Sequence, residues 1–164
     1  MVPSASELSS RMDVDLTSND GSGTTIPIVV ANMTAISGRR MAETIARRGG
    51  ITVIPQDIPH AVVDSVIKWV KTRHTFFDTA ITLNPHQTVA DAVSLLHKRA
   101  HGAIVIVDGG KPVGIVTEED CRSVDRFTQL HQVMSKELIT MADNLDARAA
   151  FEFLNLHRHK LAPV

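Results

Sequence analysis

Two side chains three residues apart, Thr117 and Asp120, are the first candidates for chemistry in this 164-residue sequence. They follow an apolar run and open a short predicted helix that begins Glu-Glu-Asp at residues 118–120. A helix N-terminus presents unpaired amide groups to which phosphate can bind. The same spacing is also that of a capping box, in which the side chains satisfy those amides and no ligand is required. Both interpretations stay open, and they are compatible, because one hydroxyl can serve each purpose in different states.

The histidines and the single cysteine give weaker indications. His97 and His101 are four residues apart on a predicted helix, a spacing that could hold a metal. No matching acidic triad accompanies them, and Lys98 and Arg99 lie between them, so we predict a solvated helix end and no metal site. Cys121 is the only cysteine, which excludes an intramolecular disulfide and a cysteine zinc cluster. We predict that it is a small packed side chain.

Charge and hydropathy exclude several classes of partner. Lys and Arg number 17 and Asp and Glu number 18, a net charge of -1, so we predict no nucleic acid and no membrane as partner. No apolar run approaches the roughly 20 residues that span a bilayer. The amino end lacks the basic start and apolar stretch of a signal peptide. These features favour a cytoplasmic location.

The first part of the chain indicates a strand, a helix and a second strand in tight succession. Residues 26–31 and 51–54 are short runs rich in β-branched residues, which favour strands buried on both faces of a parallel sheet. A helix is predicted over residues 38–48, and Gly49-Gly50 closes it where a left-handed residue is needed. We therefore predict a βαβ unit and an α/β fold.

A second helix begins at Pro59 and ends in a basic turn at residues 71–74, which complements the helix dipole. Its predicted buried stripe consists of Val62, Val63, Val66, Ile67 and Val70. Trp69 lies on the same helix, and we predict that it packs at a domain or subunit contact. The domain boundary is predicted here, giving residues 1–73 and 74–164.

The second part contains an internal repeat with an offset of 58 residues, in which Ile81-Thr82-Leu83 matches Ile139-Thr140-Met141. The first copy covers residues 75–124 and the second residues 125–164. Thr88 and Asp146 are equivalent predicted helix N-caps. The predicted apolar helix faces are Val89, Ala92, Val93 and Leu96 in the first copy, and Ala147, Ala150, Phe151 and Leu154 in the second.

A strand is predicted after each of these helices, over residues 103–107 and 161–164. The first copy then turns at Asp108-Gly109-Gly110, a hairpin signal, and returns over residues 113–117. The second copy has no such hairpin within the 164 residues, so we expect a chain truncated at its carboxyl end.

The repeat, with Gly-Ile-Val-Thr-Glu-Glu-Asp at residues 114–120, resembles a tandem CBS pair, also called a Bateman module. The resemblance implies that a nucleotide binds in the cleft between the copies, with ATP or GTP as an allosteric ligand. It assigns the phosphate to the Thr117 hydroxyl and the ribose hydroxyls to Asp120, and Thr82 is a third candidate contact.

The first part resembles the amino-terminal segment of IMP dehydrogenase and GMP reductase, which share a (β/α)8 TIM barrel. The motifs that carry the resemblance are Val2-Pro3-Ser4, Ser10-Arg11, Ile-Pro-Ile-Val-Val-Ala-Asn-Met at residues 26–33, Met41-Ala42 and Gly49-Gly50-Ile51. In many members the CBS pair follows the second barrel helix, as it does here. The resemblance therefore implies a partial TIM barrel followed by an incomplete CBS module, about the first third of such an enzyme.

The same resemblance implies a substrate site and a chemistry. Met33, at the end of a barrel strand, would touch the purine nucleotide, with Asn32 and Thr34 beside it. In enzymes of the family a cysteine thiolate attacks the purine ring, and hydride is exchanged with NADPH or NAD. That cysteine lies on a later barrel loop and is not Cys121, so we expect no catalytic residue and no activity in this chain alone. Barrels of the family form tetramers, and CBS pairs can join them into octamers, so a homo-oligomer is expected.

One departure separates branches of the family. Members usually carry Ile-His-Lys after the second strand, and that lysine takes part in the chemistry of GMP reductases, whereas residues 54–57 here read Ile-Pro-Gln-Asp. Gln56 cannot donate a proton as an ammonium would. The sequence is most similar to a bacterial branch of IMP dehydrogenase-related proteins that carry Pro-Gln-Asp and act as GMP reductases.

Three hypotheses therefore stay open. The first is a fragment of an NADPH-dependent GMP reductase, which converts GMP to IMP. The second is a fragment of an IMP dehydrogenase, which converts IMP to XMP with NAD. The third is a non-enzymatic CBS nucleotide-sensing protein that keeps a vestigial barrel segment. Because two parallel strands alone leave both faces exposed, we also predict a disordered or rearranged first half in the isolated chain.

Overall fold

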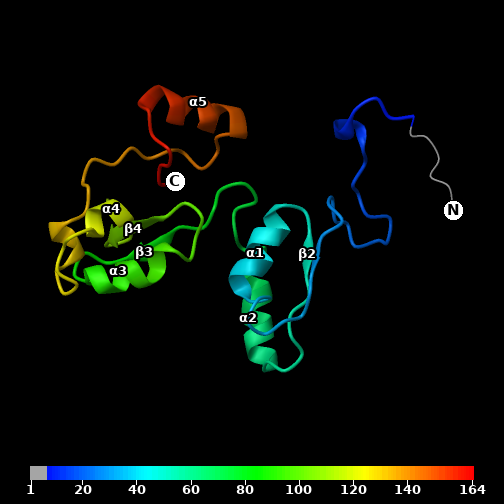
Figure 1. The fold of residues 1–164 in the computed structure, drawn as a ribbon, viewed down its shortest axis with the longest axis horizontal. Helices are drawn as coiled ribbons and strands as arrows, with labels where there is room; N and C mark the ends of the chain where they lie inside the picture. Colours follow the sequence, from blue (N-terminus) through cyan, green and yellow to red (C-terminus); the bar gives the residue numbers. More distant parts are fainter. Residues whose placement is uncertain (1–6) are drawn as a thin grey trace. The chain divides into compact units, whose positions relative to one another are not determined.

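The computed structural model describes residues 7–164, which form two compact units (Figure 1). The first unit ends at Thr75, and the second runs from Phe76 to Val164. Val2-Pro3-Ser4, which carries part of the family resemblance, lies outside the described residues. No helix in the described part of the chain is long and apolar enough to cross a membrane.

The first unit is built on the predicted βαβ arrangement. After a short 3-10 turn, η1 (Arg11–Asp13), strand β1 (Val29–Val30) pairs in parallel with β2 (Ile51–Thr52), and α1 (Arg39–Arg47) connects them. Gly49 has a φ of 88°, so it forms the predicted left-handed end of α1. A Cβ at Gly49 would also overlap the Thr25 hydroxyl, which leaves glycine as the residue that fits. Helix α2 (His60–Lys71) then follows.

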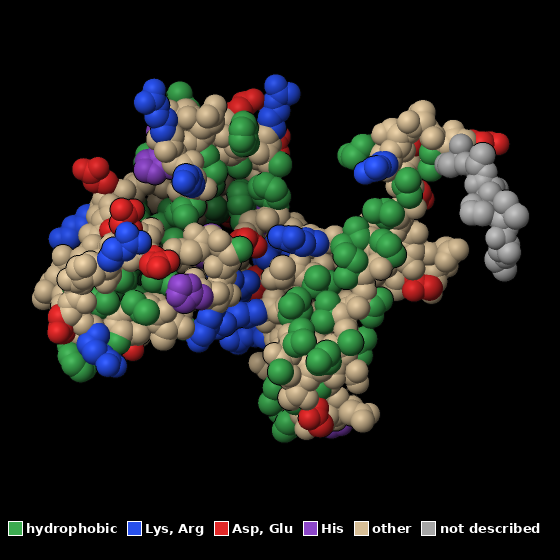
Figure 2. Space-filling model, in the orientation of Figure 1, with side chains coloured by type: hydrophobic (Ala, Val, Ile, Leu, Met, Phe, Trp, Pro, Cys, Tyr) green, Lys and Arg blue, Asp and Glu red, His purple; other side chains and the backbone are tan. Residues whose placement is uncertain are grey.

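The strands of the first unit are shorter and more exposed than predicted. Each has two residues, and Val29 and Ile51 are 64% and 41% exposed, so the prediction of strands buried on both faces was wrong. Among residues 7–164 the two strands form a two-stranded sheet with each other and with no further strand, so no larger sheet shields them from water. In the predicted stripe of α2 only Val66 is buried. Figure 2 accordingly shows hydrophobic side chains spread over the surface of this unit.

A buried carboxylate joins the two helices of the first unit. Glu43 of α1 is 2% exposed and forms an ion pair with Arg47 at 2.9 Å. Its other oxygen accepts a hydrogen bond from the indole nitrogen of Trp69 on α2, also at 2.9 Å. The guanidinium groups of Arg39 and Arg73 lie 4.3 and 4.0 Å from the indole ring centroid. These contacts of Trp69 are all within the first unit, and its predicted place at a domain or subunit contact stays a prediction.

The second unit contains a three-stranded sheet in the order β3-β4-β5. Strand β3 (Ile81–Leu83) is parallel to β4 (Ala103–Asp108), which is antiparallel to β5 (Lys111–Thr117). The predicted hairpin is confirmed, because Asp108 pairs with Lys111 and the two intervening glycines have φ of 54° and 79°.

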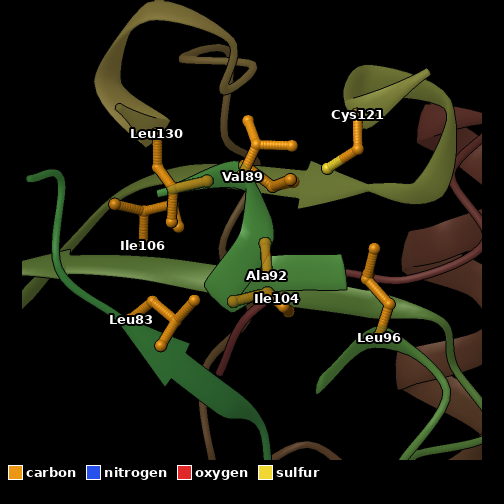
Figure 3. Close-up of a cluster of buried hydrophobic side chains, with 9 residues drawn as sticks. Leu83, Val89, Ala92, Leu96, Ile104, Ile106, Cys121 and Leu130 are labelled. Atoms are coloured by element: carbon orange, nitrogen blue, oxygen red, sulfur yellow. The ribbon is translucent and has the colours of Figure 1, made fainter. Parts of the chain in front are cut away.

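One face of this sheet carries the hydrophobic core. Helix α3 (Val89–Leu96) begins at Thr88, the predicted N-cap, and packs on the sheet beside the short helix α4 (Glu118–Cys121). The buried cluster, drawn in Figure 3, consists of Leu83, Val89, Ala92, Leu96, Ile104, Ile106, Val116, Cys121 and Leu130. Leu130 comes from η2 (Leu130–Gln132), near the beginning of the second copy.

The second copy of the repeat is less regular than the first. Helix α5 (Ala147–His157) begins at Asp146 as predicted, and the Asp146 carboxylate accepts from the Ala149 amide at 2.8 Å. The strand predicted over residues 161–164 does not form, and residues 139–141, which match β3 in the repeat, form no strand either. The Met141 amide nevertheless donates to the Pro163 carbonyl at 2.9 Å.

That single bond falls where the repeat predicts strand pairing. The offset of 58 residues places Met141 on Leu83 and Pro163 on Val105, and Leu83 pairs with Ile106, the next residue. The second copy therefore begins the same ladder without extending it. The equivalent residues Val93 and Phe151, both assigned to the predicted apolar faces, are 44% and 68% exposed, so these faces are not buried over their full width. In both helices they lie at the edge of the apolar stripe.

Candidate functional site

The predicted capping box forms at the end of β5. Oδ2 of Asp120 accepts hydrogen bonds from the Thr117 amide at 2.7 Å and from the Thr117 hydroxyl at 2.8 Å. Because the hydroxyl hydrogen points to the carboxylate, Oγ1 offers only acceptor lone pairs to a neighbouring group. The hydroxyl would have to rotate away from Asp120 before it could donate to a phosphate. Oδ1 of Asp120 takes no part in the box.

Thr117 and Asp120 line a hollow of about 300 Å³ whose other walls come from both copies of the repeat. It is lined by Ile115, Thr117, Asp120, Ser135, Glu137, Leu138, Ile139, His159, Lys160, Leu161 and Pro163. The first copy contributes the hydroxyl and one carboxylate, and the second contributes His159 and Lys160. A lysine ammonium and a histidine ring N–H are suitable hydrogen-bond donors to an anion.

Thr82 lies on the same face of the sheet as Thr117 but in a neighbouring hollow. It pairs with Val105, which pairs with Ile115, and Ile115 is two residues from Thr117, so these side chains share one face. Thr82 lines a hollow of about 460 Å³ that is mainly apolar in its lining, with Val105, Met141 and Leu154 among its walls. Ile115, Leu161 and Pro163 line both hollows. The structure therefore places Thr82 and Thr117 on one face of the sheet, with Asp120 of α4 bonded to Thr117, but it does not bring all three residues into one hollow.

Cys121 follows Asp120 and points into the core of the second unit (Figure 3). Its side chain is buried, which confirms the predicted packed role. Burial raises the pKa of the Cys121 thiol, and the negative charge of Asp120 raises it further. A thiol held in its neutral form is a poor nucleophile.

The predicted substrate residues of the first unit lie just after β1. Asn32, Met33 and Thr34 are all exposed, with Met33 at 54%. The Thr34 hydroxyl donates to the carboxylate of Asp57, at 3.1 Å from Oδ2 and 3.3 Å from Oδ1. Asp57 follows β2, and the carboxyl ends of neighbouring parallel strands lie at the same edge of a sheet.

Asp57 is a residue that the sequence analysis did not assign to the site. The available signal was its position just after the second strand, at the same edge as Thr34. A hollow of about 470 Å³ opens beside Thr34 and is lined by Ser37 and by Arg39, the first residue of α1, on one side and by Pro55 on the other. Ser37 is fully buried and donates to the Met33 carbonyl at 3.0 Å, which fixes the loop behind Met33.

Within residues 7–164 no group of three or more His, Cys, Asp or Glu side chains could hold a metal ion. His97 ends α3 and is exposed, and His101 is partly exposed.

Comparison with known proteins identifies both parts of the chain. The family model for the CBS domain matches residues 77–126. GMP reductase of Mycobacterium tuberculosis is 50% identical over 154 residues, which cover 94% of this chain and 32% of that protein. Inosine-5'-monophosphate dehydrogenase of Mycobacterium bovis is 33% identical over 143 residues, 85% of this chain and 27% of the relative.

The same family appears among solved structures. GMP reductase of Trypanosoma brucei, in a crystal structure with guanosine 5'-triphosphate, matches with a TM-score of 0.63 at 23% identity. The match covers 96% of this chain and 40% of that one, and at this identity it shows the fold alone.

The chain spans about a third of the length of the curated relatives that it matches. The alignment with the GMP reductase covers 94% of this chain and therefore includes residues of both units. Across both units the chain is therefore similar to members of the IMP dehydrogenase and GMP reductase family.

Proposed function

We propose that this chain is part of an NADPH-dependent GMP reductase, which converts GMP to IMP and responds to purine nucleotides bound at its CBS unit. One observation carries this proposal: the chain is 50% identical to GMP reductases but only 27–33% identical to the IMP dehydrogenases compared with it. The difference also disfavours the alternative, an NAD-dependent IMP dehydrogenase. The first unit is then the beginning of a TIM barrel in a homo-oligomer, a tetramer or octamer.

In this proposal the loop after β1 meets the substrate. Asn32, Met33 and Thr34 contact the purine nucleotide at the carboxyl end of the strand, the end at which TIM barrels keep their active sites. Their exposure and the adjoining hollow of about 470 Å³ support this role. The nicotinamide cofactor supplies a hydride when bound, and we assign none of the described residues to it.

The CBS unit binds the regulatory nucleotide, ATP or GTP, on the sheet face shared by Thr82 and Thr117. The apolar hollow beside Thr82 suits a purine ring, and Oδ1 of Asp120 is able to accept from a ribose hydroxyl. His159 and Lys160 suit the phosphates, which Thr117 joins if its hydroxyl rotates. Binding then regulates by population shift, favouring one arrangement of module and barrel.

An enzymatic assay of the protein encoded by the complete reading frame tests the activity. We expect GMP-dependent oxidation of NADPH, followed as loss of absorbance by the reduced nicotinamide. IMP-dependent reduction of NAD in its place would establish the dehydrogenase. If neither reaction occurs and the chain binds nucleotides only, the third hypothesis, a CBS sensing protein, replaces both.

Calorimetric titration of the chain with ATP, ADP, AMP and GTP tests the regulatory site. Asp120→Asn retains an oxygen that can accept from Thr117 but loses the charge that favours ribose hydroxyls, so we expect weaker binding by about tenfold. Glu119→Ala, an exposed change in the same helix, serves as the control and should bind as the parent does. If Asp120→Ala also binds as tightly as the parent, the ribose assignment is wrong.

A further inference from the structure

We propose that Thr34 and Asp57 together select a purine nucleotide that carries an amino group, GMP, over one that lacks it, IMP. This inference rests on the proposed function and names a specificity determinant within the same substrate site. Asp57 acts through Thr34 as a positioning residue, and Thr34 meets the ligand.

The first step is the direction of the hydrogen bond. A carboxylate only accepts, so the hydrogen between the two groups belongs to the Thr34 hydroxyl. Both carboxylate oxygens of Asp57 lie within reach of the Thr34 oxygen, at 3.1 and 3.3 Å. The hydroxyl hydrogen therefore stays directed at Asp57 through small rotations of either side chain. The Thr34 oxygen is left with its lone pairs, which can accept but not donate.

The second step is the position of the pair. Thr34 follows Met33 directly, and Asp57 comes from the loop after β2, 23 residues along the chain. The pair therefore bridges the two loops at the carboxyl edge of the β1–β2 pair. Thr34 lines the hollow of about 470 Å³ at this edge, and both side chains are exposed to an incoming ligand.

The third step is the chemistry of the ligand. The purine of GMP carries an amino group at C2 with two N–H donors, whereas the purine of IMP carries only a C–H there. The Thr34 oxygen, which can only accept while its hydrogen is donated to Asp57, is able to accept a hydrogen bond from that amino group. When IMP binds, the same acceptor loses its water and gains no donor, which is the situation in which polar sites discriminate most strongly.

The hydrogen bond also holds the two loops together. If that structural role were its only one, removing the bond would weaken the binding of GMP and of IMP equally. The ratio of the two affinities separates these roles. We would measure dissociation constants for GMP and IMP by calorimetry on the protein from the complete reading frame, in the parent and in Thr34→Val, Thr34→Ser and Asp57→Asn. Asp64→Asn, the same change at an exposed carboxylate of α2 outside the lining of this hollow, is the matched control.

We expect Thr34→Val to weaken the binding of GMP about tenfold relative to that of IMP, because the acceptor for the amino group is lost. Asp57→Asn should shift the ratio in the same direction, since the amide no longer supplies a negative charge, whereas Thr34→Ser and Asp64→Asn should keep the parental ratio. An unchanged ratio in Thr34→Val and Asp57→Asn, with GMP still bound by the parent and reduced by it, overturns this inference and leaves the proposed function standing. A parent that binds neither nucleotide overturns both.

Discussion

Glu43 and Asp64 form the same type of ion pair on neighbouring helices, with a basic residue four positions later, but in very different surroundings. The Glu43 side chain is 1% exposed and that of its partner Arg47 is 10% exposed, whereas Asp64 and Lys68 are 61% and 74% exposed. Desolvation makes a buried carboxylate dependent on its partners, and water screens the exposed pair. The two pairs should therefore contribute very differently to stability.

We expect Glu43→Ala to lower the free energy of unfolding by about 3–5 kcal/mol, because it removes the buried acceptor that both the Arg47 guanidinium and the Trp69 indole N–H, each only partly exposed, use in the folded chain. Asp64→Ala, the control, should change it by no more than about 0.5 kcal/mol. Urea denaturation followed by Trp69 fluorescence measures both. Equal effects of the two substitutions would show that burial at Glu43 does not set the strength of its interactions.

The Cys121 thiol reports the surroundings of the nucleotide-binding candidate Asp120. Its pKa is raised by burial first and by the Asp120 charge second, so at neutral pH less of it is thiolate than in an ordinary cysteine. We expect alkylation by iodoacetamide, followed by mass spectrometry, to be slower in the folded chain than in urea at every pH up to the raised pKa. In Asp120→Asn the pH at which the alkylation rate is half of its maximum should be lower than in the parent, while in Glu119→Ala it should be unchanged. A midpoint that does not respond to Asp120→Asn would remove the charge as a cause.

At the scale of elements, the sequence predicted which segments are helices and hairpins better than how far the strands extend. Helix α1 and the β4–β5 turn depend on local signals, a glycine with positive φ in each case. Strand length depends on what lies beside the strand, and residues 26–31 carry no information on whether a neighbour covers them. For the same reason the partnership of Thr34 with Asp57, 23 residues away, could not be predicted from local patterns.

The two-residue turn between β4 and β5 has a testable preference. Gly109 and Gly110 have φ of 54° and 79°, as a type I′ turn requires. We expect Gly109→Ala to destabilise the second unit by about 1–2 kcal/mol, since an alanine resists positive φ, whereas Gly109→Asn should cost less because asparagine tolerates it. Thermal unfolding followed by far-UV circular dichroism compares the two. An alanine variant as stable as the asparagine variant would contradict the assigned turn.

At the scale of the whole molecule, the two units differ in how much apolar surface they bury. The second unit has a continuous core on one face of a three-stranded sheet. In the first unit, hydrophobic residues of both strands and of α2 remain exposed. The family resemblance could be predicted from sequence across both units, because it rests on motifs, but this imbalance in burial depends on which neighbours each strand has.

The imbalance predicts a difference in local stability that hydrogen exchange can measure. The amides of Ile51 and Val53 donate to Ile28 and Val30 at 3.1 and 3.0 Å, but they do so in a two-stranded pair whose Val29 and Ile51 face is exposed to water. Opening that pair uncovers little additional apolar surface, so its free energy should be small. The amide of Ile115, which donates to Ser135 at 2.9 Å beside the buried cluster, is the matched comparison. In the monomeric 164-residue chain we expect exchange at Ile51 and Val53 to be at least tenfold faster than at Ile115, since a difference of about 1.4 kcal/mol in opening is tenfold in rate. Protection of Ile51 and Val53 equal to that of Ile115 would mean that the parallel pair is stable by itself, and the predicted disorder or rearrangement of the first half would then be wrong.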